Sequence, residues 1–351
     1  MKTKHAALLL LVVVVALSAC QRQLIHRYQS FSFGTLIELK IRHADKTVAD
    51  QASSQLFAYF DAKHKEWHAW EPGKLSDLNQ QLTGGNWFST DDSLINLVKL
   101  AKTASEMSNH LFNPAIGKLI ASWGFHSSDL PQSPPAQSKI NSMLAMQPSM
   151  NEIIIDGNRL RSDNPHIKLD LGAIAKGYAV SEAIQMLKKT GISHALINAG
   201  GDLCGLGDQG DRQWRIGIRD PSGKGILASI ELANNECVFT SGDYERYFNY
   251  QGKKYHHIID PRHGYPAQQT TSVTVLHENG AMADAASTAL FIAGPDGWQE
   301  IAQKMGISAV MMVDREGRII LSPSMHERIR LEPGHENRVV ITSIAAPGSL
   351  Q

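Results

Sequence analysis

Residues 168–189 read KLDLGAIAKGYAVSEAIQMLKK. Its apolar spacing predicts a helix from Ala173 to Lys189 that ends at Gly191. A short strand, His194 to Asn198, follows, and strand-like segments then dominate as far as Thr274. Because strands and helices are mixed without a regular βαβ alternation, the sequence predicts an α+β fold rather than a doubly wound sheet.

The segments on either side extend this pattern. Before the central helix we expect a strand at Phe31–Ile41, helices at Thr47–Lys65 and Ser93–Met107, a surface insertion at Ser127–Ser138, and a hairpin around Asp156-Gly157-Asn158. After it we expect a helix at Met282–Ala293, a buried strand at Ile307–Val313 and a further strand at Arg318–Leu321. The sequence therefore predicts one large domain over residues 31–333 and a polar tail, 334–351, that is partly disordered.

The first residues have the pattern of an export signal. Lys2 and Lys4 precede an apolar stretch, Ala6 to Leu17, which is shorter than the ~20 residues that span a bilayer. We therefore expect a cleaved signal peptide at 1–19. Leu17-Ser18-Ala19-Cys20 resembles the bacterial lipobox, so Cys20 is the expected acylation site and residues 20–30 the expected lipid-anchored linker.

Charge and cysteine content narrow the function classes. Lys plus Arg total 34 and Asp plus Glu total 34, so no long-range field favours nucleic acid. Apart from Cys20, only Cys204 and Cys237 are present, too few for a disulfide scaffold. These two cysteines either form one bridge in an oxidising compartment or are simply small buried residues.

The opening of the central helix has residues suited to an anionic ligand. Asp170, Gly172 and Lys176 lie there, where backbone N–H groups favour an anion and a glycine allows close approach. On its own this pattern is weak evidence for an anion-binding site, because an Asp before a helix is more often only an N-cap.

Asp284 and Thr288 lie four residues apart in an otherwise apolar helix. That spacing puts both oxygens on one face, and Mg²⁺ prefers oxygen ligands with one or two carboxylates and substrate phosphates. The alternative is a threonine that bonds back to its own helix beside a solvated aspartate.

A histidine pair, His256 and His257, precedes Ile258-Ile259-Asp260-Pro261. A histidine near neutrality can take a proton from a hydroxyl nucleophile. Adjacent strand residues point to opposite faces, so at most one of the two should face a site.

Taken together, these segments resemble the ApbE family of FAD:protein FMN transferases. The resemblance covers most of the chain after Cys20 and is carried by Phe33-Gly34-Thr35, Lys74-Leu75-Ser76-Asp77-Leu78-Asn79, Phe112-Asn113-Pro114, Trp123-Gly124-Phe125, Asp170-Leu171-Gly172, Ala175-Lys176-Gly177-Tyr178, Asn198-Ala199-Gly200-Gly201-Asp202, Thr240-Ser241-Gly242-Asp243-Tyr244, His257-Ile258-Ile259-Asp260-Pro261, Ala283-Asp284-Ala285 and Ser287-Thr288-Ala289. It implies an ApbE-like, T-fold-like domain of mixed sheets and helices with two intertwined lobes.

The resemblance also assigns roles to residues. It implies that His257 is the catalytic base and that Mg²⁺ is held by the Ala173 carbonyl, Asp284 and Thr288. The FAD contacts that it implies are Phe33, Trp70, Leu111, Phe112, Asn113, Asp170, Lys176 and Ile258.

Two positions depart from the family pattern: Asn113 replaces its usual Asp, and Phe33 its usual Met. Both replacements keep shape or polarity, so FAD binding is expected to survive. An Asn cannot, however, carry the charge of the Asp.

The implied activity is Mg²⁺-dependent transfer of FMN from FAD to a Thr or Ser hydroxyl, with AMP released. The implied acceptors are subunits of membrane electron-transfer complexes of the sodium-pumping NADH:quinone oxidoreductase type, met by an anchored enzyme facing the periplasm, most simply on the inner membrane. The alternatives are a Mg²⁺-dependent FAD pyrophosphatase and a non-catalytic FAD-binding lipoprotein.

Overall fold

A nine-stranded sheet forms the centre of the computed structural model, which describes residues 24–127, 129–223 and 225–344. Its strand order is β1-β2-β6-β7-β10-β13-β14-β15-β17. Neighbours are antiparallel except β15 and β17. The strands are β1 (Leu24–Ser32), β2 (Thr35–His43), β6 (Ala195–Ala199), β7 (Asp202–Leu206), β10 (Cys237–Gly242), β13 (Thr270–His277), β14 (Ala309–Asp314), β15 (Ile319–Leu321) and β17 (Val339–Ile341).

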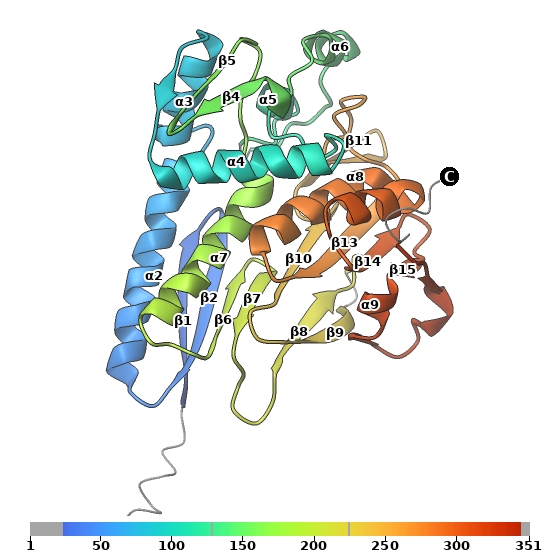
Figure 1. The fold of residues 1–351 in the computed structure, drawn as a ribbon. Coiled ribbons are helices and arrows are strands. Elements are labelled where there is room, and N and C mark those ends of the chain that lie inside the picture. The colour runs from blue at the N-terminus through green and yellow to red at the C-terminus, as the bar shows by residue number, and fades with distance from the viewer. Residues whose placement is uncertain (1–23, 128, 224, 345–351) are drawn as a thin grey trace, which may run out of the picture.

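Helices cover one face of this sheet. Figure 1 shows α2, α7 and α8 in front of the strands, with α4 crossing above them. Their bounds are α2 (Lys46–Glu66), α4 (Asp92–Met107), α7 (Gly172–Lys189) and α8 (Gly280–Lys304). The shorter helices are α3 (Lys74–Thr83), α5 (Gly117–Ser122), α6 (Gln137–Ala145), α9 (Pro323–His326) and the 3₁₀ turns η1 (Met150–Glu152) and η2 (Glu336–Arg338).

The other face of the main sheet packs against a small sheet of order β16-β9-β8. Its strands are β8 (Trp214–Arg219), β9 (Ile226–Leu232) and β16 (Ile329–Leu331). Two further small sheets lie near α4 to α6, and their strands are β3 (Phe88–Ser89), β4 (Ile153–Asp156), β5 (Arg159–Ser162), β11 (Tyr247–Tyr250) and β12 (Lys253–His256). The result is the mixed α+β architecture that the sequence predicts.

The N-terminal strand was predicted incorrectly. The segment Phe31–Ile41 is not one strand, because Phe33 and Gly34 have φ of 52° and 71° and form the turn of a β1–β2 hairpin. Positive φ at both turn residues is what a tight hairpin requires. Because β1 pairs with β2 from Leu24 onward, most of the segment 20–30 is sheet rather than linker.

The C-terminal tail is also more ordered than predicted. Val339 to Ile341 form β17, which pairs in parallel with β15 and so adds a strand at the edge of the main sheet. Of the predicted tail 334–351, residues 345–351 lie outside the described part, as do the expected signal peptide 1–19 and Cys20.

None of the described helices is long and apolar enough to cross a membrane.

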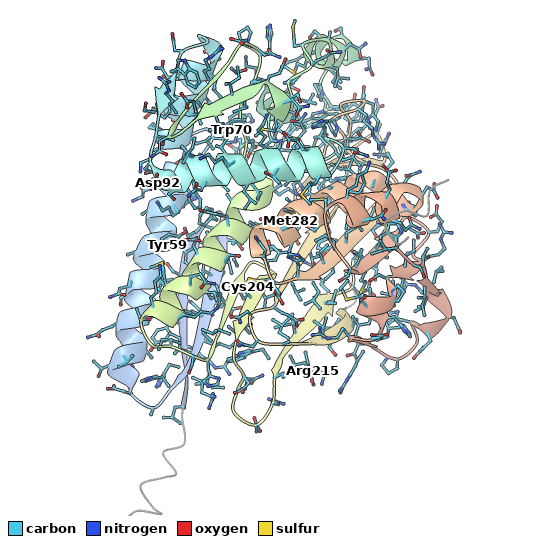
Figure 2. The ribbon with its side chains drawn as sticks, in the orientation of Figure 1. Tyr59, Trp70, Asp92, Cys204, Arg215 and Met282 are labelled. Atoms are coloured by element: carbon cyan, nitrogen blue, oxygen red, sulfur yellow. A yellow bond between two sulfur atoms is a disulfide. The ribbon has the colours of Figure 1, made fainter. Side chains whose placement is uncertain are left out.

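Cys204 and Cys237 form a disulfide between neighbouring strands β7 and β10, which settles the two alternatives left open by the sequence. Both residues are buried, and Figure 2 shows Cys204 within the central sheet. We expect its removal by the double substitution Cys204→Ala and Cys237→Ala to lower the free energy of unfolding by about 3 to 4 kcal/mol, because the bridge restricts the unfolded chain. Chemical denaturation of oxidised, reduced and substituted protein would measure this, and equal midpoints would contradict it.

Two glycines allow α7 and α8 to approach closely. A Cβ at Gly177 would lie 2.2 Å from the Gly280 carbonyl oxygen and 2.8 Å from Asp284 Cβ. This contact brings the opening of α7 against the segment of α8 that contains Asp284.

Substituting Gly177 by alanine should therefore destabilise the fold by about 1 to 3 kcal/mol, since backbone has to shift to admit the methyl group. Gly297 is the matched control, because a Cβ there meets nothing nearer than 3.8 Å. Gly297→Ala should be neutral or stabilising by up to about 1 kcal/mol, since alanine favours helix. Thermal unfolding of both variants would compare them, and equal losses would contradict the close-contact argument.

Candidate active site

A cavity of about 560 Å³ lies where the β1–β2 turn, the end of α2, the opening of α7, the end of β10 and α8 meet. All the predicted FAD, metal and catalytic positions line it: Phe33, Trp70, Leu111, Phe112, Asn113, Asp170, Ala173, Lys176, His257, Ile258, Asp284 and Thr288. The structure therefore brings together residues that are far apart in the sequence.

The opening of α7 departs from regular helix. Ala173 has φ −91° and ψ 17°, and the Gly177 N–H donates to Asp284 Oδ2 at 2.9 Å. Asp170 is not the N-cap, which is Leu171, but Asp170 Oδ1 accepts from the Gly172 N–H at 3.0 Å. Asp170, Gly172 and Ala173 of this turn all line the cavity.

Asp284 and Thr288 share one face of α8, as their spacing predicts. Asp284 is only 5% exposed, so it is not the solvated aspartate of the alternative interpretation. It is Ser287 that bonds back to its own helix, through the Asp284 carbonyl at 2.8 Å, while Thr288 Oγ1 lies 3.1 Å from Ser241 Oγ. The Thr288 hydroxyl therefore faces the cavity between α8 and β10.

Lys176 reaches across the cavity to β7. Its ammonium group forms an ion pair with Asp202 Oδ2, and Asp202 Oδ1 accepts from the Thr240 N–H at 3.1 Å. Burial alone would lower the pKa of Lys176, but the Asp202 and Asp284 carboxylates outweigh it and raise that pKa. A permanent positive charge is thus fixed beside Asp284.

The surroundings of Asp284 disfavour its charged form, whereas those of Lys176 favour the charged form. Burial raises its pKa, and Asp202 adds to this rise, while Lys176 and the Gly177 N–H oppose it. A cation bound at this carboxylate would favour its ionised form.

Asp284, Thr288 and the Ala173 carbonyl, the predicted metal ligands, offer oxygens, the ligand type that a hard divalent cation prefers. One carboxylate with neutral oxygens matches the usual preference of Mg²⁺, which completes its shell with water and phosphate. Over residues 24–127, 129–223 and 225–344, no three His, Cys, Asp or Glu side chains gather as they would for a transition metal.

Aromatic side chains form another part of the cavity lining. Phe33 lies in the β1–β2 turn. The centroid of its ring is 6.2 Å from that of Trp67 and 5.6 Å from that of His64. Trp70 packs beside His126 at 5.1 Å, and Lys168 Nζ lies 4.1 Å from the Trp70 ring centroid. The wall thus offers flat apolar surface suited to a planar ring.

The side-chain amide of Asn113 both donates and accepts a hydrogen bond. Its Nδ2 donates to the Pro148 carbonyl at 2.9 Å, and its Oδ1 accepts from the Ala115 N–H at 3.1 Å. An aspartate could make only the second bond. The amide therefore fixes the Leu111-to-Ala115 segment along the cavity edge without placing a charge there.

The two histidines separate as predicted. His256 is fully buried behind the cavity, whereas His257 is half-buried in its wall, with Nδ1 3.3 Å from the Arg246 carbonyl. Burial first, and then neighbouring positive groups, lower the pKa of His257 to about 3. The ring is therefore neutral at pH 7 and able to accept a proton.

His256 holds the backbone next to the site. Its Nε2 lies 2.7 Å from the Ala267 carbonyl, and its Nδ1 accepts from the Ile258 N–H at 3.3 Å. Burial lowers the pKa of His256 from 6.5 to about 4. A protonated ring would lose the Ile258 bond.

Acid should therefore destabilise the protein through His256. Its contribution is complete above pH 6.5 and is lost as the pH falls towards 4, because only the unfolded state binds the proton there. The loss should reach about 3 kcal/mol over that window. Denaturation of wild type and His256→Gln at pH 7 and pH 4.5 would test it, and an unchanged pH dependence in the variant would contradict it.

Several cavity residues were not among the predicted site residues. Asp202, Ser241, Glu245 and Arg246 all line the cavity. Asp202 and Ser241 lie inside quoted family motifs, which was the only signal for them in the sequence. By contrast, the motif residue Asp243 is absent from that lining and is paired with Lys254 at 2.9 Å and Arg315 at 3.2 Å, so its role is structural.

Comparison with known proteins agrees with this geometry. The ApbE family profile matches residues 33–311. A Rhodobacter capsulatus protein named FAD:protein FMN transferase is 40% identical over 304 residues, covering 87% of this chain, and the chain spans 58% of that protein's length. A Klebsiella pneumoniae protein of the same name is 31% identical, over 88% of this chain and 95% of that protein.

Solved structures give the same result. The crystal structure of the ApbE protein of Thermotoga maritima has a TM-score of 0.81 and 30% identity, covering 88% of this chain and 100% of that one. The flavin transferase ApbE of Vibrio cholerae has a TM-score of 0.78 and 25% identity, covering 87% and 99%.

Proposed function

This chain belongs to the ApbE family, and from that membership we propose that it transfers FMN from FAD to a threonine or serine hydroxyl of an acceptor protein. The observation that carries the proposal is the convergence of an aromatic wall, a fixed lysine, an oxygen-rich cation site and a neutral histidine on one cavity of about 560 Å³. That volume lies within the range of about 300 to 1,000 Å³ typical of small-molecule sites.

The flavin and its phosphates would occupy different parts of the cavity. Phe33 and Trp70 provide the flat surface for the isoalloxazine ring, with Ile258 and the Leu111-to-Asn113 segment beside it. The opening of α7 and Lys176 provide hydrogen-bond donors and positive charge for the pyrophosphate.

Mg²⁺ would be held by Asp284, Thr288 and the Ala173 carbonyl, where it would neutralise charge on the phosphates. Lys176 adds a charge that Asp202 keeps in place. The two helices that carry these groups are locked together at Gly177 and Gly280.

His257 would accept the proton of the acceptor hydroxyl. The hydroxyl oxygen forms a bond to the FMN phosphorus while the bond from that phosphorus to the bridging oxygen breaks. AMP leaves with that oxygen, and the product is an FMN phosphoester on the acceptor. His257 is neutral near pH 7, so its ring can accept this proton.

The two alternatives predict different products. A pyrophosphatase would use water in place of the acceptor hydroxyl, and a binding protein would leave FAD intact. His257, Asp284 and Thr288 are all present at the cavity, which favours catalysis over storage.

The deciding experiment incubates the domain that follows Cys20 with FAD, Mg²⁺ and a candidate flavin-carrying domain, and reads the acceptor by intact mass. A gain of one FMN that EDTA prevents is the expected result. Free FMN and AMP with an unmodified acceptor would indicate the pyrophosphatase, and intact bound FAD would indicate the binding protein.

We further propose that acylated Cys20 anchors the enzyme to a bacterial membrane on its periplasmic side, where the acceptors are subunits of electron-transfer complexes of the sodium-pumping NADH:quinone oxidoreductase type. The support is the apolar stretch Ala6–Leu17 followed by Leu17-Ser18-Ala19-Cys20. Release of the Cys20→Ala variant into the soluble fraction is expected, and unchanged membrane association would refute the anchor.

A further inference from the structure

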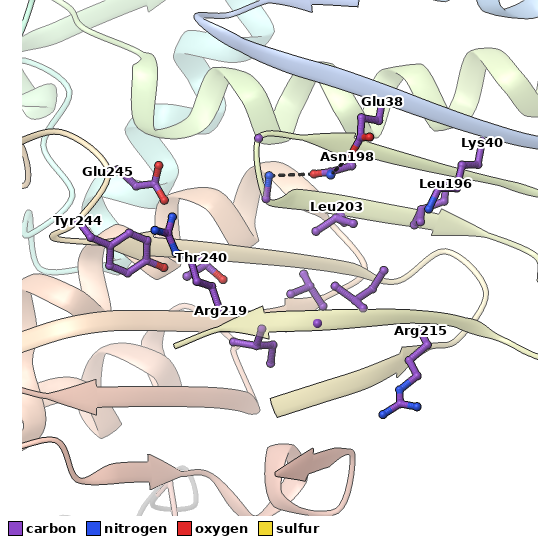
Figure 3. A pocket seen from close by; sticks show the side chains of 16 residues that line it. Glu38, Lys40, Leu196, Asn198, Leu203, Arg215, Arg219, Thr240, Tyr244 and Glu245 are labelled. Atoms are coloured by element: carbon purple, nitrogen blue, oxygen red, sulfur yellow. Dashed lines mark hydrogen bonds between the residues drawn. The ribbon is translucent and has the colours of Figure 1, made fainter. Parts of the chain in front are cut away.

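A second cavity, of about 430 Å³, runs along the free edge of β8. Figure 3 shows it from close by, with Arg215 at one end of β8 and Arg219, Tyr244 and Glu245 at the other. Five consecutive residues of β8, from Arg215 to Arg219, line it. The cavity is thus a groove whose wall is a strand.

The strand β8 is the last of its sheet, which has the order β16-β9-β8. In the part of the chain that the structure describes, no strand pairs with its other edge. Side chains alternate along it: Trp214, Ile216 and Ile218 are buried against the main sheet, and the residues between them are exposed. Its outer edge therefore presents backbone N–H and C=O groups to the groove.

The floor of the groove is the uncovered part of the main sheet. Lys40 of β2 and Leu196 of β6, which are directly paired, contribute side chains to it, together with Asn198. An additional strand beside β8 would lie over this floor, with alternate side chains facing down.

The groove continues into the FAD cavity. Gly200, Thr240 and Glu245 line both. The Arg219 guanidinium lies 4.9 Å from the centroid of the Tyr244 ring, so the C-terminal end of β8 is the end next to the shared residues. A chain that follows β8 towards Arg219 is thereby led to the site of transfer.

We propose that the acceptor protein binds by adding an extended segment to the edge of β8, which leads its threonine or serine hydroxyl into the FAD cavity. This inference rests on the proposed function and deepens it, because it names how the acceptor is recognised. Strand addition draws its affinity from main-chain hydrogen bonds and its selectivity from alternate side chains. The six residues of β8 would pair with an acceptor segment about 20 Å long.

Hydrogen exchange tests the pairing directly. The chain that follows Cys20 is measured alone, with FAD, and with FAD plus an acceptor domain whose reactive hydroxyl residue is replaced by valine, so that no turnover occurs. Alternate amides of β8 should exchange at least about tenfold more slowly only when the acceptor is present, because pairing removes them from water.

A groove-filling variant tests the consequence for catalysis. Lys40→Trp should raise the KM for the acceptor about tenfold or more while leaving FAD binding within about twofold, since only the groove is narrowed. Arg27→Trp is the matched control: Arg27 is directly opposite Lys40 on β1, on the same face, but does not line the groove.

The outcomes separate the two proposals. If wild type and Arg27→Trp modify the acceptor but β8 amides stay unprotected and Lys40→Trp keeps the wild-type KM, the β8 inference is overturned and the transferase stands. If neither wild type nor any variant modifies an acceptor, the transferase proposal itself fails.

Discussion

Replacing Asp284 by alanine is expected to lower FMN transfer at least about a thousandfold and to remove its dependence on Mg²⁺. The cavity has one carboxylate on this face of α8, and the other proposed ligands are a hydroxyl and a backbone carbonyl. Without that carboxylate, only neutral oxygens remain among the proposed ligands, and the nearby Asp202 is already paired with Lys176. Transfer would be followed by acceptor mass over a Mg²⁺ titration.

The loss could also arise from a disturbed fold, because Asp284 accepts the Gly177 N–H. Thermal unfolding and FAD binding should therefore be measured on the same sample. Asp296→Ala serves as the control, since Asp296 is exposed on the same helix and does not line the cavity. Mg²⁺-stimulated transfer by a folded Asp284→Ala variant would refute the metal role.

Replacing His257 by alanine is expected to lower transfer by about a hundredfold to ten-thousandfold, the usual contribution of a general base. FAD binding should remain, because the flavin wall and the phosphate-binding turn are made by other residues. The remaining activity should lose any dependence on the His257 pKa. Single-turnover transfer at saturating FAD would isolate this step.

His166→Ala is a suitable companion variant, because His166 is exposed and outside the FAD cavity. It should behave as wild type. Wild-type turnover in the His257→Ala variant would remove His257 from the mechanism, and loss of FAD binding would reassign it to a positioning role.

The sequence predicted best where local signals are strong. The helix Ala173–Lys189 was predicted to within a residue of α7, and Asp156-Gly157-Asn158 marked the β4–β5 hairpin. Even the predicted end of the last long helix, Ala293, has a physical meaning. Helix α8 is broken at Gly294, with φ 71°, and Pro295 starts its second half.

Errors arose where long-range pairing decides the structure. Phe33 accepts a positive φ that its own preference opposes, because the β1–β2 register fixes a tight turn there. Likewise, Val339, Val340 and Ile341 of β17 are β-branched and favour a strand, but a run of three residues does not reveal that its partner is β15. Neither partner strand can be identified from spacing alone.

In the site, too, local signals predicted well and long-range contacts could not be predicted. Spacing alone placed Asp284 and Thr288 on one helix face, but it could not reveal that Gly177 and Gly280 bring that face to the opening of α7. The family resemblance supplied most of the remaining site residues. Asp202 lies inside a quoted family motif, but nothing in the sequence links it to Lys176, which lies on a distant element.

The lining of the proposed FAD cavity comes from segments that lie far apart in the sequence. One wall is the turn at Phe33, and another includes Ile292 of α8, so most of the chain must be synthesised and folded before FAD has anywhere to bind. FAD therefore cannot template early folding. As the proposed substrate, FAD should instead stabilise only the folded chain, by a free energy that grows with the logarithm of its concentration.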